Sequence, residues 1–175
     1  VISGLVPPDR GQVFFAGKEV TGAEDYTRAR MGVSRTFQDV RMFRNLTILD
    51  HIEMALEKND ENFFSSVLKK RGTHHEKVKD ILALVCLDKP LSTFASDLSY
   101  GQRKLLGLAM AVAHPHTVLL LDEPVAGVNP ALRLVIKDVL RTLKQRGETI
   151  VVIEHDMNFV MDIADYVVVM DNGKI

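Results

Sequence analysis

The sequence predicts an α/β fold in which a parallel β-sheet core is interrupted by an inserted all-helical subdomain. Two observations carry this prediction. Residues 117–170 alternate strand and helix patterns in the order strand, helix, strand, helix, strand, which is typical of a parallel sheet with right-handed crossovers. Residues 39–114 carry only helical patterns and separate this part from an earlier strand.

The last third of the chain is expected to supply three buried strands and two helices. The strands are the apolar runs TVLLLD at 117–122, TIVVIE at 149–154 and YVVVM at 166–170. Continuous apolar runs of this length are typical of strands that are covered on both faces. Asn129 and Pro130 are suited to cap and begin the first helix, which Gly147 ends. A shorter helix is expected between Met157 and Ala164.

The remaining elements divide between the start of the chain and the helical insertion. Two short strands around Ala16-Gly17 and a strand at 32–37 are expected first. Three helices are then expected at 45–57, 76–87 and 99–113. Ser99 and Gln102 form a reciprocal capping box at the start of the third helix. We therefore expect three parts, at 1–38, 39–114 and 115–175.

Composition limits the class of protein. Hydrophobic residues make up 46% and charged residues 26% of the 175 residues, as is ordinary for a soluble globular protein. The net charge of -1 lacks the basic excess of nucleic-acid-binding proteins, so we expect no nucleic-acid partner. The single cysteine, Cys86, excludes an internal disulfide. No apolar run approaches the ~18 residues of a membrane span. Because the chain begins with Val1 rather than Met, we expect it to be a fragment of a longer protein.

Two adjacent carboxylates, Asp122 and Glu123, follow the buried strand at 117–122. Ligands of open α/β sheets bind at the carboxyl ends of the strands. A bound Mg²⁺ would offset the charge of Asp122, and Glu123 is suited to act as a general base toward water. For the dipeptide alone, the alternative is a pair of solvated surface carboxylates without function.

Three further sequence features indicate a functional site only when they are considered together. Leu98–Gln102 opens a helix, and the free N–H groups of a helix N-terminus suit a phosphate, although an ordinary capped helix is the favoured explanation for this segment alone. His155 follows the strand at 149–154, and Gln38 ends the strand at 32–37. Neither residue is diagnostic by itself, and no His or Cys spacing indicates a metal cluster.

The order and spacing of these features form a joint pattern that covers essentially the whole chain. LSYGQ at 98–102 is followed by VLLLDEP at 118–124, GVNP at 127–130 and then His155. In this pattern the chain resembles the ATP-binding-cassette (ABC) ATPases, which are the motor subunits of membrane transporters. The resemblance implies a P-loop NTPase-like parallel sheet core with an inserted helical subdomain, truncated at its N-terminus, and ATP and Mg²⁺ as cofactors.

The resemblance also implies roles for single residues. Gln38 is similar to the Q-loop glutamine, which contacts Mg²⁺ and the attacking water and links to the membrane subunit. Asp122 is similar to the Walker B aspartate that holds Mg²⁺ through water. Glu123 is similar to the catalytic glutamate, and His155 to the switch histidine at the γ-phosphate.

The family's signature motif, which contacts ATP bound to the opposite subunit, is represented here by Ser99, Gly101 and Gln102. Tyr100 stands within it where the family usually has Gly. Asn129 lies in the segment that resembles the D-loop and replaces the usual Asp there, which is expected to alter communication between the two nucleotide sites.

One family motif does not occur in the chain. No G-x-x-x-x-G-K-[ST] is found among the 175 residues, and the order of motifs in the family would place it upstream of Val1. The backbone N–H groups and the Lys of that loop supply the strongest phosphate contacts. We therefore expect the intact protein to be an ATPase, and the chain by itself to bind ATP weakly and to be inactive.

Subfamily features indicate the kind of transporter. RTFQ at 35–38, VRMF at 40–43 and EHDM at 154–157 resemble the ATPases of branched-chain amino-acid importers. Urea importers, lipopolysaccharide exporters and a non-catalytic interaction module remain alternatives. The resemblance implies transmembrane permease subunits and a second ABC ATPase subunit, identical or different, as partners. It also implies a peripheral position on the cytoplasmic face of the inner membrane.

Overall fold

The computed structural model describes residues 1–36, 42–56, 74–172 and 174–175. The strands of the described residues are β1 (Phe14–Phe15), β2 (Lys18–Glu19), β3 (Val33–Arg35), β4 (Val118–Asp122) and β5 (Thr149–Ile153). The α-helices are α1 (Asp25–Arg30), α2 (Ile48–Leu56), α4 (His75–Leu84), α5 (Tyr100–Ala113), α6 (Pro130–Gln145) and α7 (Met157–Ile163), and a short 3₁₀ helix covers Ala95–Asp97.

A three-stranded parallel sheet in the order β3-β4-β5 forms the core. Val33 lies opposite Val118, and Val118 lies opposite Thr149, so the three strands run side by side from the same end. Leu119 and Leu121 of the central strand are 0% and 1% exposed. The predicted parallel α/β core is therefore confirmed, and its carboxyl ends meet at one edge.

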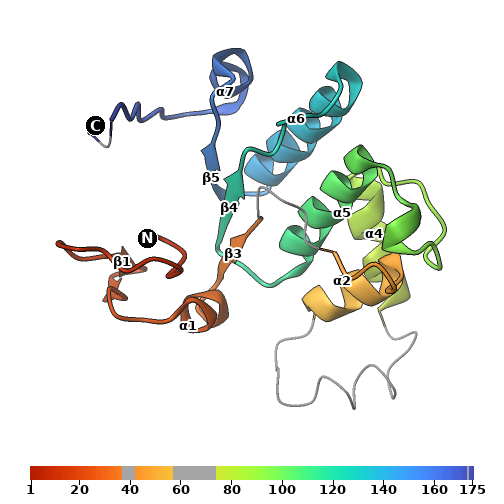
Figure 1. The fold of residues 1–175 in the computed structure, drawn as a ribbon, viewed down its shortest axis with the longest axis horizontal. Helices are drawn as coiled ribbons and strands as arrows, with labels where there is room; N and C mark the ends of the chain where they lie inside the picture. The colour runs from red at the N-terminus through yellow and green to blue at the C-terminus, as the bar shows by residue number, and fades with distance from the viewer. Residues whose placement is uncertain (37–41, 57–73, 173) are drawn as a thin grey trace.

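The helices α2, α4 and α5 pack together beside the sheet, opposite the β1–β2 hairpin and α1 (Figure 1). Ile48 and Ile52 of α2, Val78 of α4 and Leu106 of α5 are 0% exposed and share one apolar core. The helix α5 joins this cluster to the sheet and lies against β3. Its N-terminus is consequently held in a fixed position relative to the sheet.

Reciprocal side-chain caps begin α2 and α5, and the cap of α5 is the one that the sequence predicted. At α2, the Thr47 backbone N–H donates to Asp50 Oδ2 at 2.8 Å, and the Asp50 N–H donates to Thr47 Oγ1 at 3.2 Å. At α5, the Ser99 N–H donates to Gln102 Oε1 at 3.0 Å, and the Gln102 N–H donates to Ser99 Oγ at 3.3 Å. Each box satisfies N–H groups that a helix start leaves without intrahelical partners.

The helix α6 packs against β5 and against α7, and both helices lie above the sheet in Figure 1. Asn129 Oδ1 accepts from the Leu132 N–H at 2.8 Å, which caps α6 as predicted. Gly147 adopts a φ of +84°, and a residue in this conformation commonly follows the end of a helix. Asp156 Oδ1 caps α7 by accepting from the Phe159 N–H at 3.1 Å. In the described part of the chain, no helix has the length and apolar character needed to cross a membrane.

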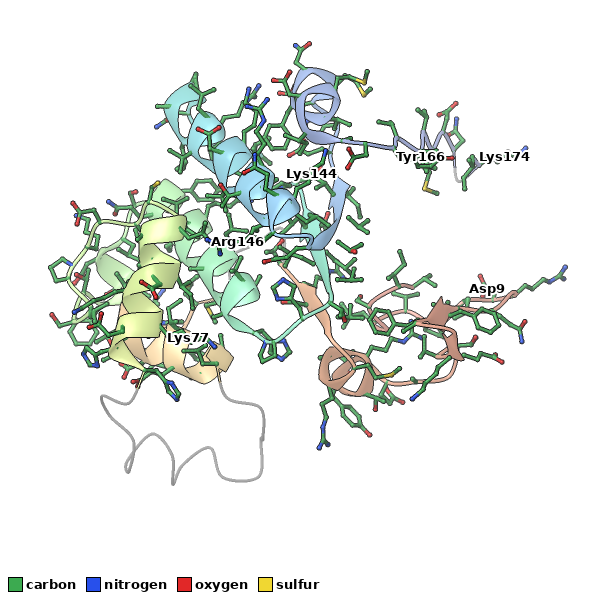
Figure 2. The ribbon with its side chains drawn as sticks, turned by 180° about the vertical axis from the view of Figure 1, so that it is seen from behind. Asp9, Lys77, Lys144, Arg146, Tyr166 and Lys174 are labelled. Carbon is green, nitrogen blue, oxygen red and sulfur yellow. The ribbon has the colours of Figure 1, made fainter. Side chains whose placement is uncertain are left out.

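The prediction of a strand at 166–170 is wrong. These residues are part of no strand among the described residues, and Tyr166 and Met170 are 84% and 67% exposed. Tyr166 and Lys174 lie on a segment that projects away from the sheet (Figure 2). An apolar run becomes a strand only where a neighbour takes up its backbone hydrogen bonds. Among the described strands, β5 pairs with β4 alone and is an edge strand of the sheet.

Candidate functional site

The candidate site lies where β4 and β5 end side by side. Asp122 is in register with Ile153, and the Glu123 N–H donates to the Ile153 carbonyl oxygen at 2.9 Å. The residues that follow the two strands are therefore neighbours although about thirty positions separate them in the sequence. This brings Asp122, Glu123 and His155 to the same edge of the sheet, as the motif order predicted.

Glu123 and His155 form a close pair at this edge. His155 Nδ1 lies 3.5 Å from Glu123 Oε1, and the two side chains are 75% and 27% exposed, respectively. Both groups are thus open to a substrate or to water. Glu123 has a φ of +46°, a left-handed conformation that costs a residue other than Gly about 1 kcal/mol and persists only where its surroundings fix it.

Two side chains of α5 hold the turn that follows Glu123. Lys104 Nζ donates to the Glu123 carbonyl oxygen at 3.1 Å, and the Tyr100 hydroxyl donates to the Ala126 carbonyl oxygen at 3.3 Å. Lys104 is only 8% exposed, and its Nζ lies 5.9 Å from the centre of the Tyr100 ring, within the range of a cation–π contact. The helix that carries the signature residues is therefore attached directly to the turn that carries Glu123.

Asp122 is paired with a cation from the adjacent strand. Arg35 Nη2 donates to Asp122 Oδ2 at 3.0 Å, and Arg35 Nη1 donates to Ser3 Oγ at 2.9 Å. The Asp122 side chain is 24% exposed, so it remains accessible to solvent. Mg²⁺ in proteins is commonly held by one or two carboxylates together with water and substrate phosphates. A partly exposed carboxylate at a strand end fits this requirement.

The described residues contain no group of three or more His, Cys, Asp and Glu side chains able to hold a metal ion by themselves.

The predicted signature residues lie together at the start of α5. Ser99 and Gln102 satisfy each other in the capping box, and a Cβ added at Gly101 would lie 2.6 Å from Leu132 Cδ2. The start of α5 therefore packs tightly on the start of α6, where Asn129 is the cap. Gln38, the remaining candidate, lies outside the described residues.

A pocket of about 500 Å³ lies among β3, α1 and α5, and Asp122 is one of its lining residues. Its lining is chiefly apolar, and it includes Arg35 and Lys104, which already donate to Asp122 and to the Glu123 backbone. Glu123 and His155 are not among its lining residues. The pocket therefore adjoins the candidate site at Asp122 and does not include the Glu123–His155 pair.

Sequence reasoning missed Lys104, Arg35 and Glu154 as parts of the site. Lys104 lies next to Leu105 in the predicted helix at 99–113, at the border of its apolar face. A charged residue at such a border was the one sequence feature that could have indicated a role for Lys104. Arg35 and Glu154 are each close to a strand end in the sequence, but their partners come from other segments of the chain. Pattern and spacing do not show such pairings.

Comparisons with a family model and with curated proteins agree with each other. A family model described as "ABC transporter" matches residues 1–126. The chain is 35% identical over 178 residues to an Archaeoglobus fulgidus protein named probable branched-chain amino acid transport ATP-binding protein LivG, a match that covers 99% of this chain and 69% of that protein. It is 32% identical to the high-affinity branched-chain amino acid transport ATP-binding protein BraF of Pseudomonas aeruginosa, with coverages of 98% and 71%.

Solved structures agree with this relationship. An ATP-binding cassette of an ABC transporter matches with a TM-score of 0.81 and 31% identity, over 99% of this chain and 71% of that chain. The ADP conformation of an ATP-binding cassette matches with a TM-score of 0.79 and 30% identity, over 99% and 70%. The predicted α/β, P-loop NTPase-like fold is therefore confirmed.

Proposed function

Because the chain belongs to the ABC transporter family, we propose that it is the ATP-binding and ATP-hydrolysing part of an importer of branched-chain amino acids. The observation that carries this proposal is the pair of Glu123 and His155 at the joined ends of β4 and β5, with the Asp122 carboxylate beside it. The names of the relatives support the class of transported substrate.

Glu123 is the general base of the proposed reaction. Its carboxylate is partly exposed, and His155 Nδ1 lies 3.5 Å away, so a water molecule can approach both groups. A base that accepts a proton from the attacking water must lie within hydrogen-bonding reach of it. His155 is proposed to orient the reacting phosphate group, and Gln38 to contact the water and Mg²⁺.

Asp122 is the proposed Mg²⁺ ligand. When bound with the nucleotide, Mg²⁺ supplies positive charge that offsets the charge on the phosphate oxygens. The contribution of this chain is to hold the carboxylate in place, and Arg35 does so through the 3.0 Å ion pair. This pair also supports Asp122 while no cation is bound.

The signature residues Ser99, Gly101 and Gln102 are proposed to contact the nucleotide of a second ATPase subunit, with Asn129 close by. A helix N-terminus with free N–H groups suits this contact with phosphate. Transmembrane permease subunits are the other proposed partners, which places the chain at the cytoplasmic face of the inner membrane. We further propose that residues 1–38 and 115–175 form the catalytic core and that residues 39–114 form the helical subdomain.

The test is Glu123→Gln in the natural protein that contains this chain, assembled with its permease. Loss of a general base lowers turnover by about 10²-fold or more. We expect ATP hydrolysis and leucine uptake by proteoliposomes to fall together, while ATP binding measured by equilibrium dialysis stays within about twofold. The matched control is Glu76→Gln, since Glu76 is an exposed carboxylate of α4. Turnover by the Glu123 variant at the level of the control would contradict the proposal, and uptake of urea without uptake of leucine would correct the substrate class.

A further inference from the structure

The carboxylate of Glu154 lies buried at the junction of β5 and α7. Its side chain is 1% exposed. Oε1 accepts from the Val125 N–H at 3.1 Å, and Oε2 accepts from the N–H groups of His155 and Asp156 at 3.1 and 3.4 Å. His155 Nδ1 lies 3.9 Å from Oε2. A buried carboxylate is tolerated where several N–H donors satisfy its oxygens, and Glu154 meets this condition.

The donors that satisfy Glu154 belong to two separate segments. Val125 lies in the turn after β4, two residues beyond Glu123, whereas His155 and Asp156 follow β5. The β4–β5 ladder extends to Asp122 and Ile153, with one further hydrogen bond from the Glu123 N–H. The Glu154 carboxylate therefore continues the connection between the two segments beyond the end of the sheet.

The turn after β4 is held from both sides by side chains. Lys104 and Tyr100 donate to the carbonyl oxygens of Glu123 and Ala126, and Glu154 accepts from the Val125 N–H between them. Contacts from both sides help to fix Glu123 in its left-handed conformation against its conformational preference. From the β5 side, the Ile153 carbonyl oxygen accepts from Glu123 and the Glu154 carboxylate accepts from Val125, and the Glu154 carboxylate also accepts from the N–H of His155.

We propose that Glu154 is a positioning residue that sets the geometry of the Glu123–His155 pair. By accepting from the backbone of both segments, its carboxylate holds Glu123 Oε1 and His155 Nδ1 at the separation of 3.5 Å. This inference rests on the proposed roles of Glu123 and His155. Glu154 itself contacts neither nucleotide nor water in the proposed reaction.

The same strand offers a matched control residue. Glu148 immediately precedes β5, as Glu154 immediately follows it, and Glu148 Oε2 lies 2.9 Å from His116 Nε2. Its side chain is 26% exposed, and it lies at the end of the strand away from the proposed site. A Gln at either position keeps the size of the side chain and removes its charge.

The experiment compares Glu154→Gln and Glu148→Gln in the natural protein that contains this chain. Gln at 154 places an NH₂ group against either the Val125 N–H or the N–H groups of His155 and Asp156, so one connection is lost. We expect kcat for ATP hydrolysis to fall about tenfold with KM for ATP within about twofold, because positioning acts on the chemical step. Amide hydrogen exchange is expected to become about tenfold faster either at Glu123, Val125 and Ala126 or at His155 and Asp156. Glu148→Gln is expected to leave kcat and both exchange rates within about twofold.

Two results would overturn the inference. The first is that Glu154→Gln and Glu148→Gln have the same kcat and the same exchange rates. The second is that kcat falls in both variants in proportion to the amount of folded protein that each has lost. If Glu154→Gln does not fold, Glu154→Asp replaces it, because Asp keeps the charge but is too short to reach both segments. We expect it to show the same selective loss of kcat, and an unchanged kcat would overturn the inference. If the unaltered protein hydrolyses no ATP, the proposed function fails, and the exchange rates alone then decide whether Glu154 connects the two segments.

Discussion

The strands β4 and β5 are alike in sequence and differ in burial. VLLLD and TIVVI are both continuous aliphatic runs, and both were predicted to be covered on two faces. In β4, Leu119 and Leu121 are 0% and 1% exposed. In β5, Val151 and Ile153 are 39% and 62% exposed, while Ile150 and Val152 pack against the core. Two strands with the same apolar pattern can therefore differ in burial, because the pattern does not determine the position of a strand in the sheet.

The largest expected effect comes from truncating one residue of each strand. Leu121→Ala should lower the free energy of unfolding by about 3 kcal/mol, because it leaves a cavity in the core. Ile153→Ala should cost less than about 1 kcal/mol, because the side chain is already mostly exposed. Urea denaturation of the 175-residue chain measures both values. Equal losses would show that Ile153 is covered in solution, and the contrast between the strands would then be wrong.

The same contrast explains which strands the sequence predicted correctly. Val118–Asp122 and Thr149–Ile153 pair with each other, so their patterns led to the correct elements and to the correct edge for Asp122 and His155. The run at 166–170 is equally apolar, but no strand among the described residues pairs with it. Pairing depends on which segments become neighbours, and a local pattern holds no information about that.

The sequence patterns also did not predict which polar side chains are buried. The helix α1 was not predicted, because its six residues DYTRAR lack an apolar stripe. Its buried residue is Arg28, which is 2% exposed and donates to the carbonyl oxygens of Val1, Ile2, Thr21 and Ala23. The buried carboxylate of Glu154 escaped prediction for the same reason. Caps such as Ser99 with Gln102 were predictable, because both partners lie within one helical turn.

An intermediate effect is expected on the covered side of the sheet, where β3 meets α5. Ser34 Oγ donates to the Ala111 carbonyl oxygen at 2.8 Å, and Ser34 is 6% exposed. The residue four positions after Ala111 is Pro115, which has no N–H to donate, so Ser34 supplies the missing donor. Ser34→Ala should cost about 1.5 kcal/mol in urea denaturation, because it leaves a buried carbonyl group without this bond.

The exposed Ser96 provides the control for this measurement. Its hydroxyl donates to Asp97 Oδ1 at the surface, so Ser96→Ala should change the free energy of unfolding by less than about 0.5 kcal/mol. A similar small change for Ser34→Ala would mean that water replaces the hydroxyl at Ala111. The covered side of the sheet would then be as open to solvent as the β5 side, which would remove the contrast between the two sides.

The smallest expected effect lies on the β5 side, at the surface contact between α6 and α7. Lys137 Nζ donates to Asp162 Oδ2 at 2.8 Å, and this hydrogen bond, the charge of Lys137 and the charge of Arg141 lower the pKa of the Asp162 carboxyl from its ordinary value of 3.8. Lys137→Met should raise this pKa toward the ordinary value, as followed by NMR titration of the side chain. Lys79→Met, which removes an exposed pair on α4, should leave it unchanged.

The sign of the accompanying stability change follows from the direction of the pKa shift. A carboxyl whose pKa is lower in the folded state stabilises the fold above its unfolded pKa, and this contribution is lost as the pH falls through the folded pKa. The unaltered chain should thus exceed the Lys137 variant slightly in stability near neutral pH, and the difference should vanish in strong acid. A difference that persists there would mean that Lys137 acts through the packing of its aliphatic stem rather than through its charge. The β5 side would then be stabilised by apolar contact, as the β4 core is.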